Sequence, residues 1–304
     1  YASREQAGAI AFSEVSIFTV SDCIFNNNSA TNGGAITVDN SSNGTVINCN
    51  FTNCNMTAKE LPWNYSNDGW GPNPHPSSAI SWEGVNGNII NCNFIDNYAG
   101  PVMFFGSTNG NIINCSFNNH YLDGTMLVCD GDNVSVSDCN FTNSKDGSFI
   151  VLTCSNSIVT NCNFINHIAS SEYGDGGAIK VQNHDNIISY CNFINCSAVE
   201  NGGAIYFGDR YVKVDNCSVL NCNFMNCSSG KCGGTIHFAG VACVVNNCTF
   251  INSFAPERGG AIFFDYCEDN AITDCNFINC SASVDGGAIY GNNVTDGVVS
   301  GCNF

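Results

Sequence analysis

The sequence predicts an all-β fold in which the chain winds into a stack of about eleven similar coils, a β-solenoid. A Cys-x-Phe motif recurs eleven times, and a tetrad such as GGAI precedes each copy. The distance from the tetrad to the Cys is 15 or 16 residues in ten copies and 20 residues in the remaining one. A period of mostly 23 to 31 residues, rich in Val, Ile, Phe and Asn, is typical of solenoid coils and argues against helices.

Each coil is expected to hold two strands separated by turns. One strand would begin at the tetrad and the other would end in the CNF segment, with NG, DG and DN pairs between them, whose residues tolerate positive φ. Stacked coils lie about 4.8 Å apart, so eleven coils would form a rod on the order of 50 Å long. The motif copies begin at Cys23, Cys49, Cys92, Cys115, Cys139, Cys162, Cys191, Cys222, Cys248, Cys275 and Cys302, and are numbered coil 1 to coil 11 in that order.

Alternation along a strand assigns a direction to each side chain. The fourth tetrad residue is always large and apolar, as in Ile36, and is expected to point inward together with the residue two places later. The residue between these two is Lys180 in coil 7, so this position is expected to point outward. The motif Cys and Phe are expected to point inward. The Asn that follows two residues after Phe predicts a ladder of hydrogen-bonded carboxamides along the rod.

Coils 4 to 6 carry apolar residues at positions that this alternation places outside. Contiguous apolar patches on soluble proteins usually mark a contact, so these residues form a candidate contact patch. They are Val102, Phe104, Met126, Val128, Phe149 and Val151.

One large insertion, residues 55–78, enters just before coil 3 and contains Trp63, Tyr65 and Trp70. It is predicted to fold over the outer face of coils 3 to 6. Two interpretations remain open at this stage. The aromatic residues could pack on the contact patch as a local second core, or part of the patch could stay open for a partner or for a sugar ring stacked on Trp or Tyr.

The charge balance narrows the range of partners. The chain has 8 Lys and Arg against 26 Asp and Glu, a formal net charge of −18, so nucleic acid and anionic lipid would be repelled. No run of 18 apolar residues is present, so no membrane-spanning helix is expected. The chain starts and stops within repeats without a polar capping unit. Residues 1–304 are therefore expected to be one β-helix domain within a longer chain. The remainder of that chain would be one of the partners of this domain.

Twenty-one cysteines raise the question of disulfides. Eleven occupy the inward motif position and are predicted to be reduced core thiols that pack as small apolar groups. Neighbouring coils are close enough for bridges, so distance alone excludes none. The pairs considered for bridging are Cys196 with Cys227, Cys217 with Cys243, and Cys129 with Cys154. Zinc is not expected, because CxxC clusters are absent and only five His occur.

The repeat pattern brings few titratable residues together that could act in catalysis. On the outward row only Lys180 and His237 could titrate usefully, and Tyr206 lies between them. The segments NHDN at 183–186 and DRYVK at 209–213 come nearest to a catalytic cluster, but solvated turns explain them better.

Two acidic segments, DGDN at 130–133 and YCEDN at 266–270, are explained better as β-turns than as calcium sites. No catalytic residue, metal or cofactor is assigned from the sequence, and an enzyme is not expected.

The repeats resemble those of the polymorphic outer membrane proteins of chlamydiae and of the large adhesin-like proteins of methanogenic archaea. Those units carry GGAI and a downstream Phe-x-x-Asn. Here GGAI or GGTI occurs in six copies, and the second half usually reads Phe-x-Asn, as in CNFIN. The resemblance covers the whole chain and implies a right-handed parallel β-helix, display at a surface, and adhesion.

The sequence and the resemblance together favour a cell-surface or extracellular adhesin-like protein that presents an outward β-helix face. Its partner would be a protein or glycan of a host or neighbouring cell. Two alternatives remain: a glycan-active enzyme or tailspike-like depolymerase, which should gather acids and bases on one outward patch, and a surface spacer without a ligand.

Overall fold

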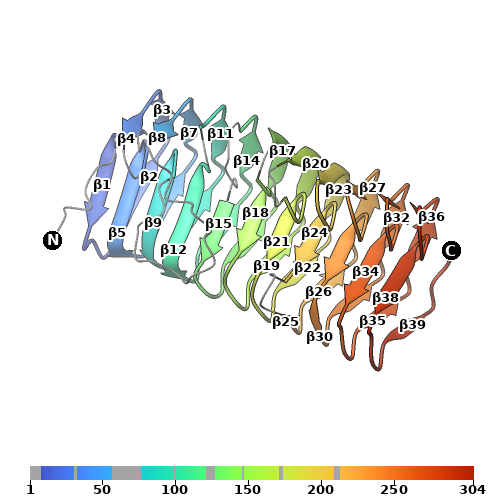
Figure 1. Cartoon of the computed structure of the whole chain (residues 1–304). Helices are drawn as coiled ribbons and strands as arrows, with labels where there is room; N and C mark the ends of the chain where they lie inside the picture. Colours follow the sequence, from blue (N-terminus) through green and yellow to red (C-terminus); the bar gives the residue numbers. More distant parts are fainter. Residues whose placement is uncertain are drawn as a thin grey trace, which may run out of the picture.

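The structure, a computed structural model, describes residues 8–30, 33–56, 77–98, 100–120, 127–145, 147–170, 174–208 and 213–304. They form 39 strands wound into a right-handed parallel β-helix, with β1 (Ile10–Ser13) and β39 (Val298–Ser300) at opposite ends of the rod (Figure 1). The predicted all-β solenoid is confirmed. None of the described residues forms a helix that could cross a membrane.

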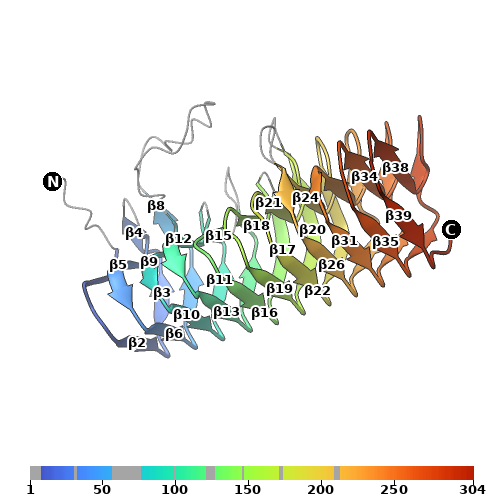
Figure 2. The same ribbon diagram turned by 90° about the horizontal axis from the view of Figure 1, so that it is seen from below.

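Three long parallel sheets run along the rod (Figure 2). The first, here called the tetrad sheet, contains the strands that begin at the tetrads. Its members in spatial order are β1 (Ile10–Ser13), β5 (Ile36–Ser42), β9 (Ile80–Val85), β12 (Val102–Thr108), β15 (Leu127–Asp130), β18 (Ile150–Leu152), β21 (Ile179–Val181), β24 (Ile205–Phe207), β29 (Ile236–Phe238), β34 (Ile262–Asp265) and β38 (Ile289–Asn292).

The second sheet, the middle sheet, lies between the tetrad strand and the motif Phe in each coil. Its strands are β2 (Phe18–Ser21), β6 (Gly44–Ile47), β10 (Asn88–Ile90), β13 (Asn111–Ile113), β16 (Ser135–Ser137), β19 (Ile158–Thr160), β22 (Ile187–Ser189), β26 (Ser218–Leu220), β31 (Val244–Asn246), β35 (Ala271–Thr273) and β39 (Val298–Ser300).

The third sheet, the Phe sheet, contains the motif Phe of coils 1 to 10. Its main strands are β3 (Ile24–Asn26), β7 (Asn50–Thr52), β11 (Asn93–Ile95), β14 (Ser116–Asn118), β17 (Asn140–Lys145), β20 (Asn163–Ala169), β23 (Asn192–Ala198), β27 (Asn223–Met225), β32 (Thr249–Ile251) and β36 (Asn276–Ile278). Short strands extend it or pair beside it: β28 (Ser228–Ser229), β33 (Phe254–Ala255), β37 (Ser281–Ala282), β4 (Ser29–Ala30) with β8 (Asn55–Met56), and β25 (Val214–Asp215) with β30 (Gly240–Val241).

Left-handed residues form the corners between the sheets. In coil 6 these are Asn156, Asn161 and Asn166, with φ of 56°, 53° and 57°, five residues apart. Asn and Asp dominate these columns because their short polar side chains tolerate the left-handed conformation at low cost. The repeated Asn of the sequence is therefore a backbone requirement, and it leaves three-residue strands between the corners.

The motif Phe side chains stack along the interior. From Phe25 to Phe304 successive ring centroids lie 4.7 to 5.1 Å apart and the rings are nearly parallel. Each such aromatic pair contributes roughly 0.5–1.5 kcal/mol beyond the apolar area that it buries. The predicted inward Phe ladder is confirmed.

The motif Cys side chains form a second inward column beside the Phe ladder. The Cys115 thiol donates to the carbonyl oxygen of Ile113, at 3.3 Å, and its sulfur accepts the backbone N–H of Cys92, at 3.4 Å. The same acceptor role recurs in later coils, for example from Cys222 N–H to Cys248 Sγ at 3.4 Å. The sulfur therefore satisfies a buried backbone donor at the corner where the chain turns inward.

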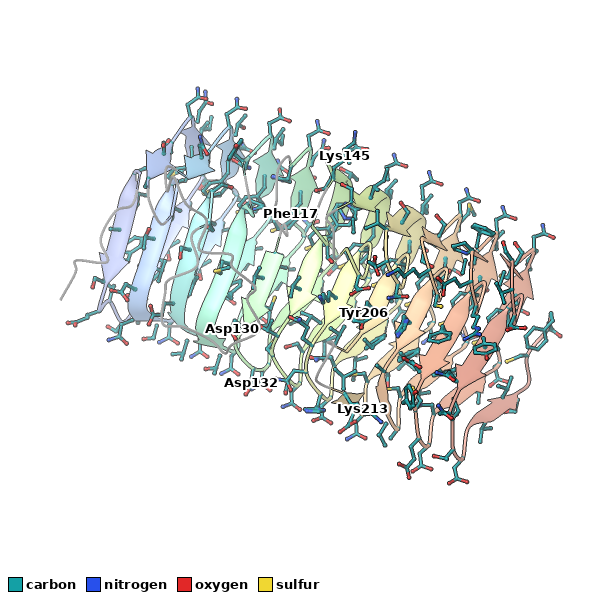
Figure 3. All side chains as sticks on the ribbon, viewed as in Figure 1. Phe117, Asp130, Asp132, Lys145, Tyr206 and Lys213 are labelled. Atoms are coloured by element: carbon teal, nitrogen blue, oxygen red, sulfur yellow. The ribbon has the colours of Figure 1, made fainter. Side chains whose placement is uncertain are left out.

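The predicted amide ladder is confirmed at the corner that follows Phe. Asn195 Nδ2 donates to Asn166 Oδ1 at 2.9 Å, Asn226 to Asn195 at 3.1 Å, and Asn252 to Asn226 at 3.0 Å. Figure 3 shows such repeated polar side chains along the edges of the rod. The Asn Nδ2 of each coil donates to the Asn Oδ1 of the previous coil, so these hydrogen bonds hold the Asn side chains in one column along the rod axis.

The tetrad is a turn in which two successive side chains point inward. The N–H groups of Ala35 and Ile36 both donate to the carbonyl oxygen of Ala79, at 3.0 and 2.9 Å, and both side chains are buried. The alternation of a strand therefore begins only after this pair. In coils 7 to 11 the first Gly of the tetrad has positive φ, and at Gly202 a Cβ would lie 2.3 Å from the carbonyl oxygen of Ile205.

The first outward position after the tetrad forms a row along the outside of the tetrad sheet, here called the outer row. Its side chains stack on one another, with Tyr206 and His237 ring centroids 4.9 Å apart and His237 and Phe263 also 4.9 Å apart. These three residues are only 5 to 7% exposed. The row consists of Ala11, Thr37, Ser81, Met103, Val128, Val151, Lys180, Tyr206, His237, Phe263 and Tyr290.

A thiol titration tests the state of the cysteines. All 21 are free, and only Cys23, Cys280 and Cys302 are partly exposed. Burial raises the pKa of the Cys129 thiol well above its ordinary value, and the other buried thiols are enclosed in the interior, where a reagent cannot reach them. We expect three thiols to react rapidly with a disulfide reagent at pH 8 in the native protein, and 21 after unfolding without reductant. Fewer than 21 in the unfolded protein would show that bridges exist.

His237 predicts a loss of stability in acid. Burial lowers the pKa of its imidazole to about 3, and Nδ1 has no hydrogen-bond partner among the described residues. The unfolded chain takes up a proton below its ordinary pKa of about 6.5, so this contribution to stability is complete above pH 6.5 and is lost as the pH falls toward 3. The loss is roughly 3 kcal/mol at pH 4.

The change His237→Phe removes this titration while keeping a ring between Tyr206 and Phe263. We expect its melting temperature to fall by several degrees less between pH 7 and pH 4 than that of the wild type, measured by circular dichroism. An equal fall in both proteins would contradict this role of His237.

Candidate functional site

The structure corrects the candidate contact patch in coil 4. Val102 pairs with Ile80 and Phe104 with Trp82, so both point inward, and they are 1% and 0% exposed. Their predicted outward placement is wrong. Pairing between β9 and β12 shifts between Phe105 and Thr108, where coil 4 holds one residue more than coil 3. A fixed spacing back from the Cys therefore displaced the tetrad by one residue, and Met103 holds the outward position instead.

Phe149 is also buried, and its outward placement is wrong. It occupies the third tetrad position, where the turn points two successive side chains into the interior. Its ring centroid lies 5.9 Å from that of Phe141, 6.0 Å from that of Phe164 and 4.2 Å from that of His167. Most other coils have Ala at this position, and the larger Phe149 side chain fills the interior of coil 6.

Val128 and Val151 lie side by side on the outer row as expected, although Val151 is buried within it. Met126 and the insertion residues Trp63, Tyr65 and Trp70 lie outside the described residues, as does 57–76 of the insertion 55–78. The residues proposed from the sequence therefore do not form one exposed patch in the described part of coils 4 to 6.

The cysteine pairs are unbridged. Cys196 and Cys227 occupy equivalent positions of adjacent coils, and so do Cys217 and Cys243. Cys129 instead pairs with Leu152, so Cys154 is not its equivalent. All six thiols are free in the structure.

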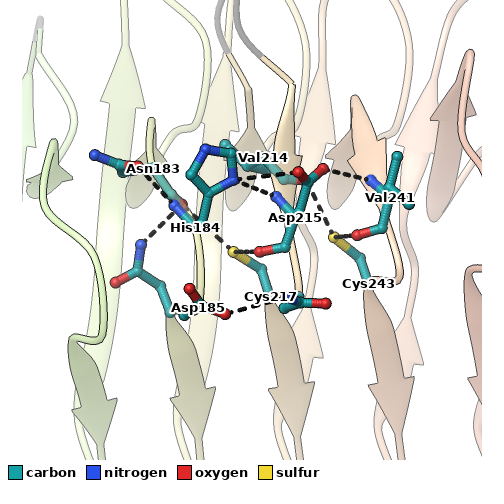
Figure 4. A network of polar contacts seen from close by, with 10 residues as sticks. Asn183, His184, Asp185, Val214, Asp215, Cys217, Val241 and Cys243 are labelled. Atoms are coloured by element: carbon teal, nitrogen blue, oxygen red, sulfur yellow. Dashed lines mark hydrogen bonds and ion pairs between the residues drawn. The ribbon is translucent and has the colours of Figure 1, made fainter.

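The NHDN segment forms part of a polar network with the next coil (Figure 4). The backbone N–H of Asp215 donates to His184 Nδ1 at 3.0 Å, and the Asp215 carboxylate accepts the N–H of Val241 at 3.2 Å. Asn216 Nδ2 donates to Asp185 Oδ1 at 3.2 Å. Each contact joins one coil to its neighbour, so the imidazole and carboxylates brace successive turns.

Two further charged residues also join coils, Asp132 to the next coil and Lys213 to the second coil along. Asp132 Oδ1 accepts the N–H of Ser155 at 2.9 Å, and Lys213 Nζ donates to the carbonyl oxygen of Tyr266 at 2.7 Å. Residues 209–212 of the DRYVK segment lie outside the described residues. In the part of the chain that the structure describes, no group of three His, Cys, Asp or Glu side chains could hold a metal ion.

A carboxyl group that sequence reasoning missed lies beside Lys180. Burial raises the pKa of Asp175, and the Lys180 ammonium partly opposes that rise. Asp175 Oδ1 accepts both the backbone N–H and Nδ2 of Asn201, each at 3.1 Å, while Lys180 Nζ lies 5.8 Å from the ring centroid of Tyr206. Asp175 belongs to the turn before β21 and not to the outer row itself. The sequence pattern of the outer row therefore gave no sign of this acid.

A continuous line of outward apolar side chains lies on the Phe sheet. In coils 6 to 10 the residue after the motif Phe points outward and is Ile or Met, and successive residues pair directly. Met225 is 42% and Ile278 47% exposed, and the other three residues are half-buried. The five residues, here called the stripe, are Ile165, Ile194, Met225, Ile251 and Ile278.

Fixed amide groups lie on both sides of the stripe. The corner ladder of Asn166, Asn195 and Asn226 follows it, and a second column precedes it, in which Asn192 Nδ2 donates to Asn163 Oδ1 at 2.9 Å. Each carboxamide uses one N–H and one oxygen lone pair within its column, so it keeps a further donor and acceptor. The surface thus combines a central apolar line with positioned hydrogen-bonding groups.

Charge is nearly absent from this surface, here called the uncharged flank. It consists of residues 161–166, 190–195, 221–226, 247–252 and 274–279, among which only Asp274 is charged. The whole chain carries a net charge of −18. Sequence reasoning passed over the flank, although its signal is visible as Ile or Met after Phe in five successive motifs.

Comparisons with known proteins agree with this architecture. The family described as right handed beta helix region matches residues 78–230, and the repeat of Chlamydia polymorphic membrane proteins matches residues 22–39. No curated protein matches the chain.

Three solved structures are similar at low identity. The catalytic domain of a GH87 α-1,3-glucanase in complex with tetrasaccharides is 11% identical, with a TM-score of 0.46, over 97% of this chain and 64% of that chain. The surface protein and adhesin PfbA of Streptococcus pneumoniae is 11% identical, with a TM-score of 0.40, over 98% of this chain and 92% of that chain.

The tailspike protein gp49 of Acinetobacter baumannii bacteriophage Fri1, a capsular polysaccharide depolymerase, is 12% identical, with a TM-score of 0.44, over 94% of this chain and 57% of that chain. The present chain thus spans less than two thirds of the glucanase and tailspike chains. The β-helix family match covers just over half of the present chain. The chain belongs to the right-handed β-helix family and carries a repeat of the Chlamydia polymorphic membrane protein type.

Proposed function

We propose that the protein is a cell-surface adhesin-like rod that binds its partner through the uncharged flank. The observation that carries this proposal is the stripe, five successive outward aliphatic side chains on a chain with a net charge of −18. An exposed apolar surface of this extent, bordered by polar groups, is a common mark of a contact site.

The chemistry of the flank suits reversible binding. Its amides and aliphatic side chains lose less hydration free energy on contact than carboxylates would, so a partner displaces water from it at low cost. The backbone bonds between coils hold its strands in place, so little conformational entropy is lost on binding. A rigid, weakly hydrated face is what a surface rod needs in order to make repeated contacts.

The surface location rests on family likeness. The repeat at residues 22–39 matches that of the Chlamydia polymorphic membrane proteins, whose name places them in a membrane. The resemblance of the GGAI units to archaeal adhesin-like proteins points the same way. An extracellular or surface position also accords with the acidic composition, which keeps such a rod soluble.

A glycan-active enzyme is the second candidate, and Asp175 is the observation that favours it. A carboxyl group with a raised pKa beside Lys180 and Tyr206 could serve as a general acid toward a bound sugar. His237 is less suited to acid–base work, since burial keeps its imidazole neutral down to a pH of about 3.

Attachment of protein-coated beads to a panel of intact cells tests the adhesin proposal. The change Met225→Lys puts a charge on the stripe, and we expect roughly tenfold fewer attached beads, because a charge must then be desolvated at the contact. The matched control is Ile158→Lys on the middle sheet, where Ile158 is exposed to a similar degree as Met225. Equal attachment by both variants and the wild type would reject the flank as the contact site.

Release of reducing sugar from cell-surface polysaccharides tests the second candidate. The adhesin proposal predicts binding without release. Release that is lost in Asp175→Asn, with the melting temperature unchanged, would identify the protein as a glycan-active enzyme instead.

A further inference from the structure

We infer that the partner of the uncharged flank is the same flank of a second copy of this chain, so that two rods pair side by side. This inference rests on the proposed function, because it assigns a partner to the face that the proposal makes the contact site. Three features of the flank support it: its symmetry, its charge and its size.

The stripe is symmetric about Met225, the third of its five residues. Two identical faces meet about a two-fold axis, which is the usual symmetry of paired identical chains. With the axis at Met225 and the rods antiparallel, Ile194 lies opposite Ile251 and Ile165 opposite Ile278; with the rods parallel, each residue lies opposite its own copy. Met225 meets Met225 in both arrangements, and its flexible thioether can adapt to either.

The distribution of charge favours an uncharged partner. A charged surface pressed against the flank would lose hydration without gaining an opposite charge, since Asp274 is the only charged residue there. A second copy brings an equally uncharged face. The other 25 acidic residues, from the total of 26, stay outside the contact, and most of their mutual repulsion is screened at physiological salt, where the Debye length is about 8 Å.

The hydrogen-bonding groups of two flanks also complement each other. Each flank repeats its carboxamides at the coil spacing of about 4.8 Å, except at Thr249 in the column that precedes the stripe, so two flanks present donors and acceptors at the same interval. Each Asn of the ladders keeps one N–H and one lone pair outside its own column. Pairing can therefore leave few buried polar groups without partners.

The area of the flank predicts a weak pair. Five coils span about 24 Å along the rod and six residues about 20 Å across it, which gives about 500 Å² per copy and about 1,000 Å² in total. Stable interfaces bury about 1,200 Å² or more. Pairing would therefore be weak between single molecules in solution and strong between arrays of many copies, as on the surfaces of two cells.

Sedimentation equilibrium of the full chain, from about 1 μM to 1 mM in 150 mM salt, tests the inference. We expect the average mass of the wild type to rise from that of a monomer toward that of a dimer. Met225→Lys and Met225→Glu, each alone, place like charges opposite each other at the axis, so each should associate at least tenfold more weakly. An equimolar mixture of the two variants should recover association, because Lys then faces Glu.

The control Ile158→Lys should associate like the wild type, and unchanged melting temperatures should show that all variants fold. A wild type that stays monomeric at every concentration would overturn the inference, as would single variants that associate as the wild type does, or a mixture that recovers nothing. Beads that attach to cells through the flank while the wild type stays monomeric would reject the second copy and keep the proposed function. Pairing of rods without flank-dependent attachment would reject the proposed function alone.

Discussion

Hydrogen bonding between the backbones of successive coils is the interaction on which the rest of this structure depends. Each coil donates to and accepts from the next in parallel register, as from Asn192 N–H to the carbonyl oxygen of Cys162 at 3.0 Å. Equivalent residues are thereby held about 4.8 Å apart, which is close to the ideal separation of stacked rings and within reach of side-chain amides. The Phe ladder, the Cys column and the Asn ladders are three consequences of this one spacing.

The same spacing governs the outer surface. A residue type that recurs at one outward position becomes a line along the rod, so five Ile and Met residues that are far apart in sequence form the stripe. The Asn corners keep the strands short and the amide columns close beside it. The flank is uncharged because the residues between its corners are Cys, Asn or Thr, Phe, and Ile or Met in each of the five coils.

Much of the fold could be predicted from the sequence, because solenoid coils repeat and the period is long. The inward Phe, the corner Asn and the outward Lys180 all follow from the motif and from alternation. The register of coil 4 could not be predicted, since one extra residue after Phe105 is invisible to an alignment that assumes constant spacing. Phe149 was misplaced because the tetrad turn points two neighbours inward. The flank and the proximity of Asp175 to Lys180 appear only when the coils are set side by side.

Photo-cross-linking from the centre of the stripe tests most directly the claim that this coil stack builds a face for its own copy. Met225 is replaced by a photo-reactive phenylalanine analogue, the full chain is irradiated at high concentration, and the attached peptides are identified by mass spectrometry. We expect adducts between two chains that map to the five segments of the uncharged flank. Adducts confined to the loops around the tetrad sheet, or a product that stays monomeric, would contradict it.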